Sequence, residues 1–167
     1  MSGESLRRSA GHVLDLCRTR GLRIATAESC TGGLVAAALT EIAGSSDVVD
    51  CGFVTYSNEA KHKILGVPAR TLKRHGAVSA ETAAAMANGA LKNSHADLAV
   101  AVTGIAGPGG GSKQKPVGLV YFAAAARGGP CAARSRRFGK IGRAGVRHHS
   151  VAQALKLLEA IAKAVRG

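Results

Sequence analysis

The chain has 167 residues, of which 46% are hydrophobic and only 3% aromatic. This length suits one domain, residues 1–167, whose core is built from closely packed Ala, Val, Leu and Ile, and the apolar content excludes a disordered chain. No apolar run is long enough to span a bilayer, and the first ten residues lack the apolar segment of a signal peptide. We therefore expect a cytoplasmic protein with no membrane partner.

The charge balance is strongly basic, because 23 Lys and Arg oppose 10 Asp and Glu, a formal net charge of +13. Such a charge favours anionic partners, whether nucleic acid, phosphorylated metabolites or acidic surfaces. Only Phe138 interrupts the basic run at 134–149, whereas surfaces that bind single strands stack bases on several aromatic rings. We interpret the basic residues mainly as a solvated face and do not expect direct nucleic-acid binding.

The four cysteines form no C-x-x-C pair, which favours reduced thiols over a disulfide or zinc framework. The adjacent His148 and His149 would point in different directions on a helix and make a poor pair of metal ligands. The sequence therefore predicts no metal site and no cofactor.

The first half of the chain alternates helices and strands. Leu6, Ala10, Val13, Leu14 and Cys17 repeat at helical spacing, and Gly21 ends that helix. The patterns that follow predict strands at 22–27, 50–56 and 98–103, and helices at 34–43, 58–65 and 80–92. Ser57 and Ser79 are typical N-caps of the last two helices.

The second half begins with a long loop, 104–116, which contains five glycines and two prolines. Two strands, 117–125 and 131–138, follow around a turn at 127–130, and a helix at 143–165 closes the chain. That helix has an apolar face of Val151, Leu155, Leu158, Ala162 and Val165.

This order predicts an α/β fold, a three-layer α/β/α sandwich with a mixed five-stranded sheet. Helical crossovers join the first three strands, so those strands should be parallel. The fourth strand has no helix before it and forms a hairpin with the fifth, so it should run antiparallel to the others. We expect helices on both faces of the sheet.

Three loops follow the carboxyl ends of the parallel strands, where open α/β sheets bind ligands. In the loop at 28–33, Ser29, Thr31, Gly32 and Gly33 precede a helix, whose free N–H groups and dipole favour an anion. Because E-S-C-T-G-G matches no phosphate-binding fingerprint, a plain strand-to-helix turn with a Ser or Thr cap stays an alternative.

The other two loops carry hydroxyls, lysines and glycine. Lys61 lies four residues after Ser57 on one helical face, so it could look back to the strand end or be a solvated helix charge. The loop that begins T-G-I-A-G-P-G-G-G-S permits close approach to a ligand, since loops of this length are uncommon without a function, although a flexible connection is the alternative.

Four blocks, A-E-S-C-T-G-G, G-F-V-T-Y-S-N-E-A-K, G-A-V-S and T-G-I-A-G-P-x-G-G-S-x-x-K-P-V-G, resemble the CinA C-terminal domain family. The resemblance covers about residues 5–165 and implies the same mixed-sheet α/β/α fold. The chain is similar in particular to the stand-alone amidohydrolase members of that family. That similarity implies deamidation of nicotinamide mononucleotide (NMN) to nicotinate mononucleotide and ammonia, in recycling of pyridine nucleotides. A non-catalytic binding module associated with competence and DNA damage is the alternative.

The resemblance points to Ser29 as nucleophile, Lys61 as its proton acceptor, and Tyr56 as a group that relays a proton or fixes Lys61. Cys30 is a rival nucleophile, and direct attack by water is a third possibility. The substrate-binding residues that it implies are Glu28, Thr31, Gly32, Gly33, Ser57, Asn58, Thr103, Gly104, Ala106, Gly107 and Arg143.

Backbone N–H groups of residues 31–33 could bind either the oxyanion or the 5′-phosphate, and the sequence leaves both open. The chain departs from the family pattern where Gly109, Lys113, Gln114 and Gly142 stand at places that are commonly acidic. We also expect a homo-oligomer, with which the Ala-rich helices are compatible.

Overall fold

Five strands form one mixed sheet in the order β2-β1-β3-β4-β5 in the computed structural model, which describes residues 3–165. The strands are β1 (Ile24–Glu28), β2 (Val49–Val54), β3 (Leu98–Gly104), β4 (Leu119–Ala126) and β5 (Cys131–Arg137). Strands β1, β2 and β3 are parallel, β4 is antiparallel to β3, and β5 is antiparallel to β4. The predicted mixed sheet with an antiparallel fourth strand is confirmed.

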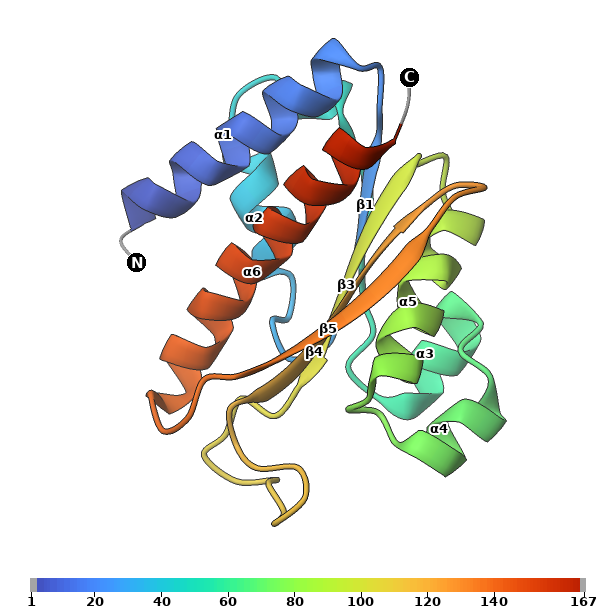
Figure 1. The fold of residues 1–167 in the computed structure, drawn as a ribbon, viewed down its shortest axis with the longest axis vertical. Coiled ribbons are helices and arrows are strands. Elements are labelled where there is room, and N and C mark those ends of the chain that lie inside the picture. Colours follow the sequence, from blue (N-terminus) through green and yellow to red (C-terminus); the bar gives the residue numbers. More distant parts are fainter. Residues whose placement is uncertain (1–2, 166–167) are drawn as a thin grey trace.

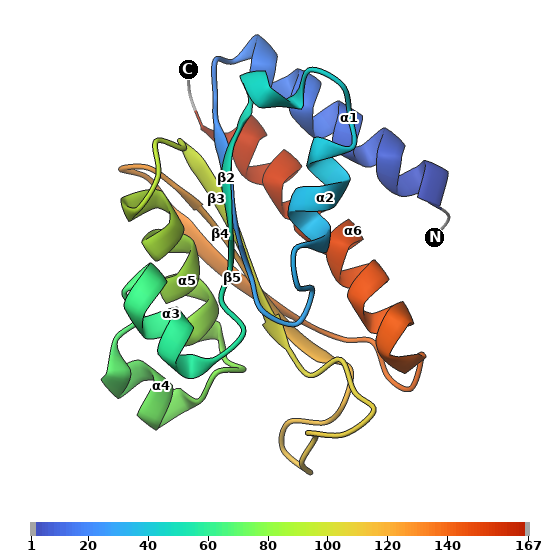
Figure 2. The same ribbon diagram turned by 180° about the vertical axis from the view of Figure 1, so that it is seen from behind.

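Helices cover both faces of this sheet (Figures 1 and 2). The helices are α1 (Gly3–Thr19), α2 (Leu34–Thr40), α3 (Asn58–Leu65), α4 (Ala69–His75), α5 (Ala80–Lys92) and α6 (Gly142–Ala164), with a 3₁₀ turn η1 at Ser45–Asp47. Helices α1, α2 and α6 lie on one face, and α3, α4 and α5 lie on the other. No helix among residues 3–165 is both long and apolar enough to cross a membrane.

Strand β3 explains why the two layers differ. Leu98, Val100 and Val102 face the core under α1 and α6, whereas the alternate residues Ala99 and Ala101 face α5. Period-two alternation places bulky side chains on one side and alanines on the other. The Ala-rich α5 therefore packs against an alanine face of the sheet.

Every predicted helix and strand is present, and two short elements, α4 and η1, were not predicted. The five predicted core residues of the first helix are all buried. Helix α4 buries none of its residues, so its basic sequence has no apolar periodicity to indicate it. Helix α2 ends at Thr40, earlier than predicted, and the following segment forms η1.

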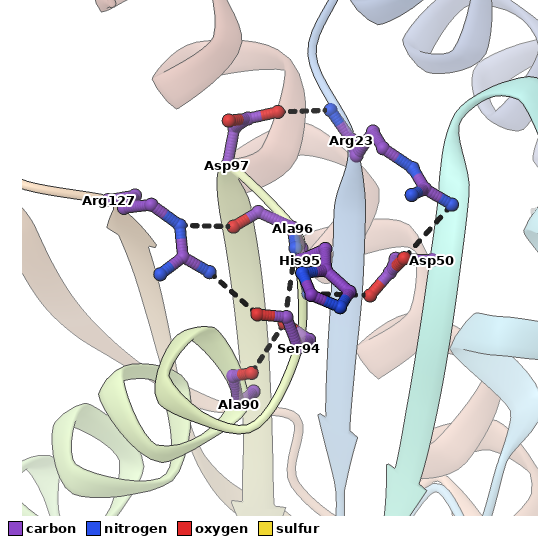
Figure 3. A network of polar contacts seen from close by, with 8 residues as sticks. All are labelled: Arg23, Asp50, Ala90, Ser94, His95, Ala96, Asp97 and Arg127. Atoms are coloured by element: carbon purple, nitrogen blue, oxygen red, sulfur yellow. Dashed lines mark hydrogen bonds and ion pairs between the residues drawn. The ribbon is translucent and has the colours of Figure 1, made fainter.

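The amino ends of the parallel strands carry a polar network (Figure 3). The Arg127 guanidinium donates to the carbonyls of Ala96 at 2.9 Å, Leu91 at 2.6 Å and Ser94 at 2.9 Å. One side chain thereby ties the end of β4 to the segment between α5 and β3.

Two carboxylates complete this network and connect three strands. Asp97 accepts from the Arg23 backbone N–H at 2.8 Å, and Asp50 pairs with the Arg23 guanidinium at 2.9 Å. Asp50 also accepts from the His95 N–H at 2.9 Å. Both carboxylates therefore have hydrogen-bond donors, as polar groups in folded proteins usually do.

Candidate active site

A cavity of about 280 Å³ lies at the opposite end of the sheet, where β1 and β3 finish. All three predicted loops contribute to it, together with the segment before α5 and the start of α6. Its lining residues are Ser29, Cys30, Tyr56, Lys61, Ala77, Val78, Thr103, Gly104, Ile105, Ala106, Gly107, Gly109, Gly110 and Arg143. The carboxyl ends of the strands thus form the hollow, as predicted for an open α/β sheet.

The Ser29 hydroxyl and the Lys61 amine are in direct contact inside this cavity. Lys61 Nζ donates to Ser29 Oγ at 2.9 Å and to the Thr55 carbonyl at 2.8 Å. The Ser57 hydroxyl accepts from the Ala60 N–H at 3.0 Å, so α3 starts immediately after the β2 loop. Lys61 lies in the first turn of that helix and points back to the strand ends, which is one of the two alternatives that the spacing left open.

Burial sets the electrostatics of Lys61. Its side chain is 1% exposed, and no carboxylate forms an ion pair with it among residues 3–165. Loss of hydration lowers the pKa of the Lys61 amine from its ordinary value, because burial disfavours the charged form. An amine of this kind can act as a base, so the pair provides a nucleophile and a proton acceptor.

The N-terminus of α2 is already occupied by Glu28, which is 1% exposed. Its carboxylate accepts from the N–H groups of Gly33 at 3.1 Å, Val35 at 3.0 Å and Ala36 at 2.9 Å. The Gly32 N–H donates to the carbonyl of residue 29 at 3.0 Å. Of the N–H groups at residues 31–33 that were expected to bind an anion, those of Gly32 and Gly33 therefore have partners within the protein.

Tyr56 and Arg143 join two loops across the mouth of the cavity. Arg143 donates to the Gly107 carbonyl at 2.9 Å through one guanidinium nitrogen and to the Tyr56 hydroxyl at 3.0 Å through the other. The Tyr56 side chain is 61% exposed, and its hydroxyl contacts Arg143 rather than Lys61. In this state Tyr56 holds the rim, whereas the Thr55 carbonyl orients the lysine.

The sequence profile of the CinA C-terminal domain matches residues 6–162. The chain belongs to the CinA C-terminal domain family. The nicotinamide-nucleotide amidohydrolase PncC of Escherichia coli K12 is 48% identical over 158 residues, which are 95% of each chain. A CinA-like protein of Geobacter sulfurreducens is 57% identical over 75% of this chain, which spans only 30% of that longer relative.

Solved structures of CinA proteins share the same fold. The competence/damage inducible protein CihA of Agrobacterium tumefaciens superposes with a TM-score of 0.91 at 55% identity, over 93% of this chain and 94% of its own. A CinA superfamily protein of Escherichia coli has a TM-score of 0.89 at 35% identity, over 93% and 90%. Each of these structures matches at least nine-tenths of both chains.

The other predicted contacts of this CinA domain fall into two groups. Thr103, Gly104, Ala106 and Gly107 line the cavity, and Thr103 is oriented by donating to the Ala77 carbonyl at 2.7 Å. The second group stands outside the lining: Glu28, Thr31, Gly32, Gly33, Ser57 and Asn58. As substrate contacts, both groups stay predictions.

Thr31 is fully buried, and its carbonyl accepts from Arg147 of α6 at 3.0 Å. This bond holds the turn that presents Ser29. The turn residues thus hold Ser29 from one side, while the cavity lies on the other.

Sequence reasoning assigned no role to Ala77, Val78, Ile105, Gly109 and Gly110, which also line the cavity. Their side chains carry no chemistry, and only the G-A-V-S block of the family pattern indicated the first two. Among residues 3–165, no three His, Cys, Asp or Glu side chains cluster as metal ligands would.

Proposed function

We propose that this CinA domain is an amidohydrolase that converts NMN to nicotinate mononucleotide and ammonia. The observation that carries the proposal is the 2.9 Å contact between Ser29 Oγ and Lys61 Nζ in the cavity. The E. coli relative that matches over 95% of the chain bears the name of that activity, which supports the substrate class. The cellular role that goes with this proposed activity is the recycling of pyridine nucleotides in the cytoplasm.

The reaction begins with attack of Ser29 Oγ on the carboxamide carbon while Lys61 Nζ takes the hydroxyl proton. The C–O bond forms and the carbonyl electrons move to oxygen. When the tetrahedral intermediate collapses, the C–N bond breaks, and Lys61 returns the proton to the leaving nitrogen, which departs as ammonia. Water then attacks the ester, with Lys61 again as base, and releases the nicotinate product and Ser29.

Lys61 fits this role only as a neutral amine. The Thr55 carbonyl accepts one of its N–H bonds at 2.8 Å, and its lone pair can then point at the Ser29 hydroxyl. The absence of a carboxylate partner matters, because an ion pair would keep the amine protonated. Arg143 and Tyr56 at the rim then enclose the substrate.

The decisive experiment measures ammonia and nicotinate mononucleotide formed from NMN by the purified chain. We expect stoichiometric amounts of both, and acid quenching should leave a nicotinoyl-nucleotide ester whose mass maps to Ser29. A chain that forms no ammonia from NMN, yet binds duplex DNA at physiological salt, would overturn the proposal in favour of a binding module. Assembly as a homo-oligomer stays a separate prediction for light scattering.

A further inference from the structure

Arg147 lies in α6, four residues after Arg143 and on the same face of that helix. Arg143 reaches the rim of the catalytic cavity, whereas Arg147 reaches the turn that bears Ser29. The Arg147 side chain is half-buried and forms no ion pair among residues 3–165, and its buried Nε has no hydrogen-bond partner in that part of the chain. Burying an unpaired charge costs stability, and departures of this kind are expected at functional sites.

The guanidinium of Arg147 holds one peptide group of the turn. Its Nη2 donates to the Thr31 carbonyl at 3.0 Å. A Cβ at Gly32 would lie 3.4 Å from that nitrogen, so the guanidinium lies against bare backbone. Gly32 also has a φ of +60°, which favours glycine at this place. The turn is therefore shaped so that a cation can bind its backbone closely.

Two peptide groups connect this guanidinium to the nucleophile. The Thr31 carbonyl, which accepts from Arg147, belongs to the same peptide group as the Gly32 N–H. That N–H donates to the Ser29 carbonyl at 3.0 Å. The Ser29 carbonyl in turn belongs to the same peptide group as the Cys30 N–H. Hydrogen bonds in such a chain polarise one another, so a cation at its start makes the N–H at its end a stronger donor.

The Cys30 N–H, at the end of this chain, directly follows the nucleophile. Cys30 lines the catalytic cavity, and no oxygen among residues 3–165 accepts from its N–H. Its own sulfur, a weak acceptor, is the partner that this N–H has. The Ser29 N–H, by contrast, already donates to the Val102 carbonyl at 2.9 Å. When a serine attacks a carbonyl, the N–H of the next residue is a common donor to the oxyanion.

We propose that Arg147 is a positioning residue for the hydrolysis: it fixes the turn at 29–32 and, through two peptide groups, strengthens the Cys30 N–H as a donor to the oxyanion. The inference rests on the proposed function. Arg147 is not part of the cavity lining, so it acts through the turn and not on the substrate. Its removal should slow the chemical step and leave NMN affinity and the protonation of Lys61 unchanged.

The test compares Arg147→Met with Arg127→Met. Arg127 is the matched control, because its guanidinium also donates to backbone carbonyls, but at the amino ends of the strands and outside the cavity (Figure 3). Arg147→Lys, which keeps the charge and a donor, is measured in parallel. Steady-state kinetics give kcat and KM for NMN per folded molecule at several pH values. Urea denaturation gives stability, and calorimetry in the Ser29→Ala background gives NMN affinity.

Arg147→Met should lower kcat by about 10- to 100-fold, somewhat less than direct loss of an oxyanion donor. Its NMN affinity and the pH at which kcat reaches its plateau should not move. Arg147→Lys should lie between Arg147→Met and wild type. Arg127→Met should lose stability and keep its kcat. An unchanged kcat in the Arg147 variants that fold, an equal loss in Arg127→Met, a shifted pH profile, or a loss confined to NMN affinity would overturn the inference.

A fluorophosphonate probe separates this inference from the proposed function. Ser29 Oγ attacks phosphorus, the P–F bond breaks, fluoride leaves and Lys61 takes the proton, so labelling reports the turn without NMN. Labelling should be about tenfold slower or more in Arg147→Met than in Arg127→Met. If the wild-type chain released no ammonia from NMN, the proposed function would fail, and this difference in rate would still support the inference. Equal rates, or no labelling of Ser29 in the wild type, would overturn it.

Discussion

At the amino ends of the strands, Asp50 has an 11% exposed side chain and accepts from both the Arg23 guanidinium and the His95 N–H (Figure 3). At the carboxyl ends, Lys61 is 1% exposed, and its amine bonds only a hydroxyl and a carbonyl among residues 3–165. The charge of Asp50 is compensated by Arg23, whereas no carboxylate pairs with Lys61 among residues 3–165. Charge compensation stabilises a fold, but it would hold a lysine in the protonated form that cannot act as a base.

The largest expected effect is loss of turnover on removal of either member of the pair. Ser29→Ala and Lys61→Ala should each lower kcat by about 10³-fold or more, and the double variant should be little worse, because the two groups act as one unit. Lys61→Arg should not rescue, since a guanidinium stays protonated. Steady-state kinetics on NMN measure all four variants. Additive losses, or rescue by arginine with only KM raised, would indicate that Lys61 merely binds an anion.

Asp50→Ala, at the amino ends of the strands, should lower the stability of the fold without changing catalysis. We expect unfolding free energy to fall by about 2 kcal/mol, because two hydrogen bonds to a carboxylate are lost. The kcat per folded molecule should not change. Urea denaturation measures the stability, and Asp15→Ala at an exposed pair on α1 is the control, expected near zero. A loss of kcat in Asp50→Ala would show that the two ends are coupled.

The effect of Lys61→Met on the free energy of unfolding should be opposite in sign to that of Asp50→Ala. Because its amine is buried without a counter-charge, replacement by an apolar chain should raise the unfolding free energy by about 1 kcal/mol at pH 7, at the expense of activity. The depressed pKa of Lys61 means that the unfolded chain binds the proton more tightly. The destabilisation of the wild-type fold by the buried charged amine is therefore full below the pKa of Lys61 in the folded chain. It disappears as pH rises toward the ordinary value of 10.5.

The corresponding activity profile provides a second check on Lys61. The wild-type kcat should rise with pH as the amine loses its proton and then reach a plateau above the depressed pKa. Denaturation of wild type and Lys61→Met at several pH values should show the stability gap closing in alkali. If the difference in unfolding free energy widened with pH, or if Lys61→Met were less stable than wild type at pH 7, Lys61 could not be a buried charge without a counter-charge.

Periodicity was sufficient to predict the sheet and the main helices, because bulky and small residues alternate with a period of two or recur every three or four positions. The spacing of Lys61 from Ser57, which caps α3, allowed Lys61 to face the strand ends but left a solvated helix charge as the alternative. It could not reveal that Glu28 closes the N-terminus of α2, because the carboxylate reaches N–H groups five to eight residues ahead. The Tyr56–Arg143 contact spans 87 residues and depends on tertiary packing.

The smallest expected effect is that of Cys30→Ala, which removes the thiol next to Ser29. Cys30 lines the same cavity, but burial raises the pKa of its thiol to about 11, so almost none is thiolate at neutral pH. The side chain is only 6% exposed, and its loss removes a small apolar contact without disturbing the Ser29–Lys61 bond. The variant should retain most of the wild-type kcat, with an unaltered pH profile and an ester still mapped to residue 29. If Cys30→Ala were as inactive as Ser29→Ala, the nucleophile would have to be reassigned to sulfur, and the contrast between the two ends of the sheet would lose its catalytic meaning.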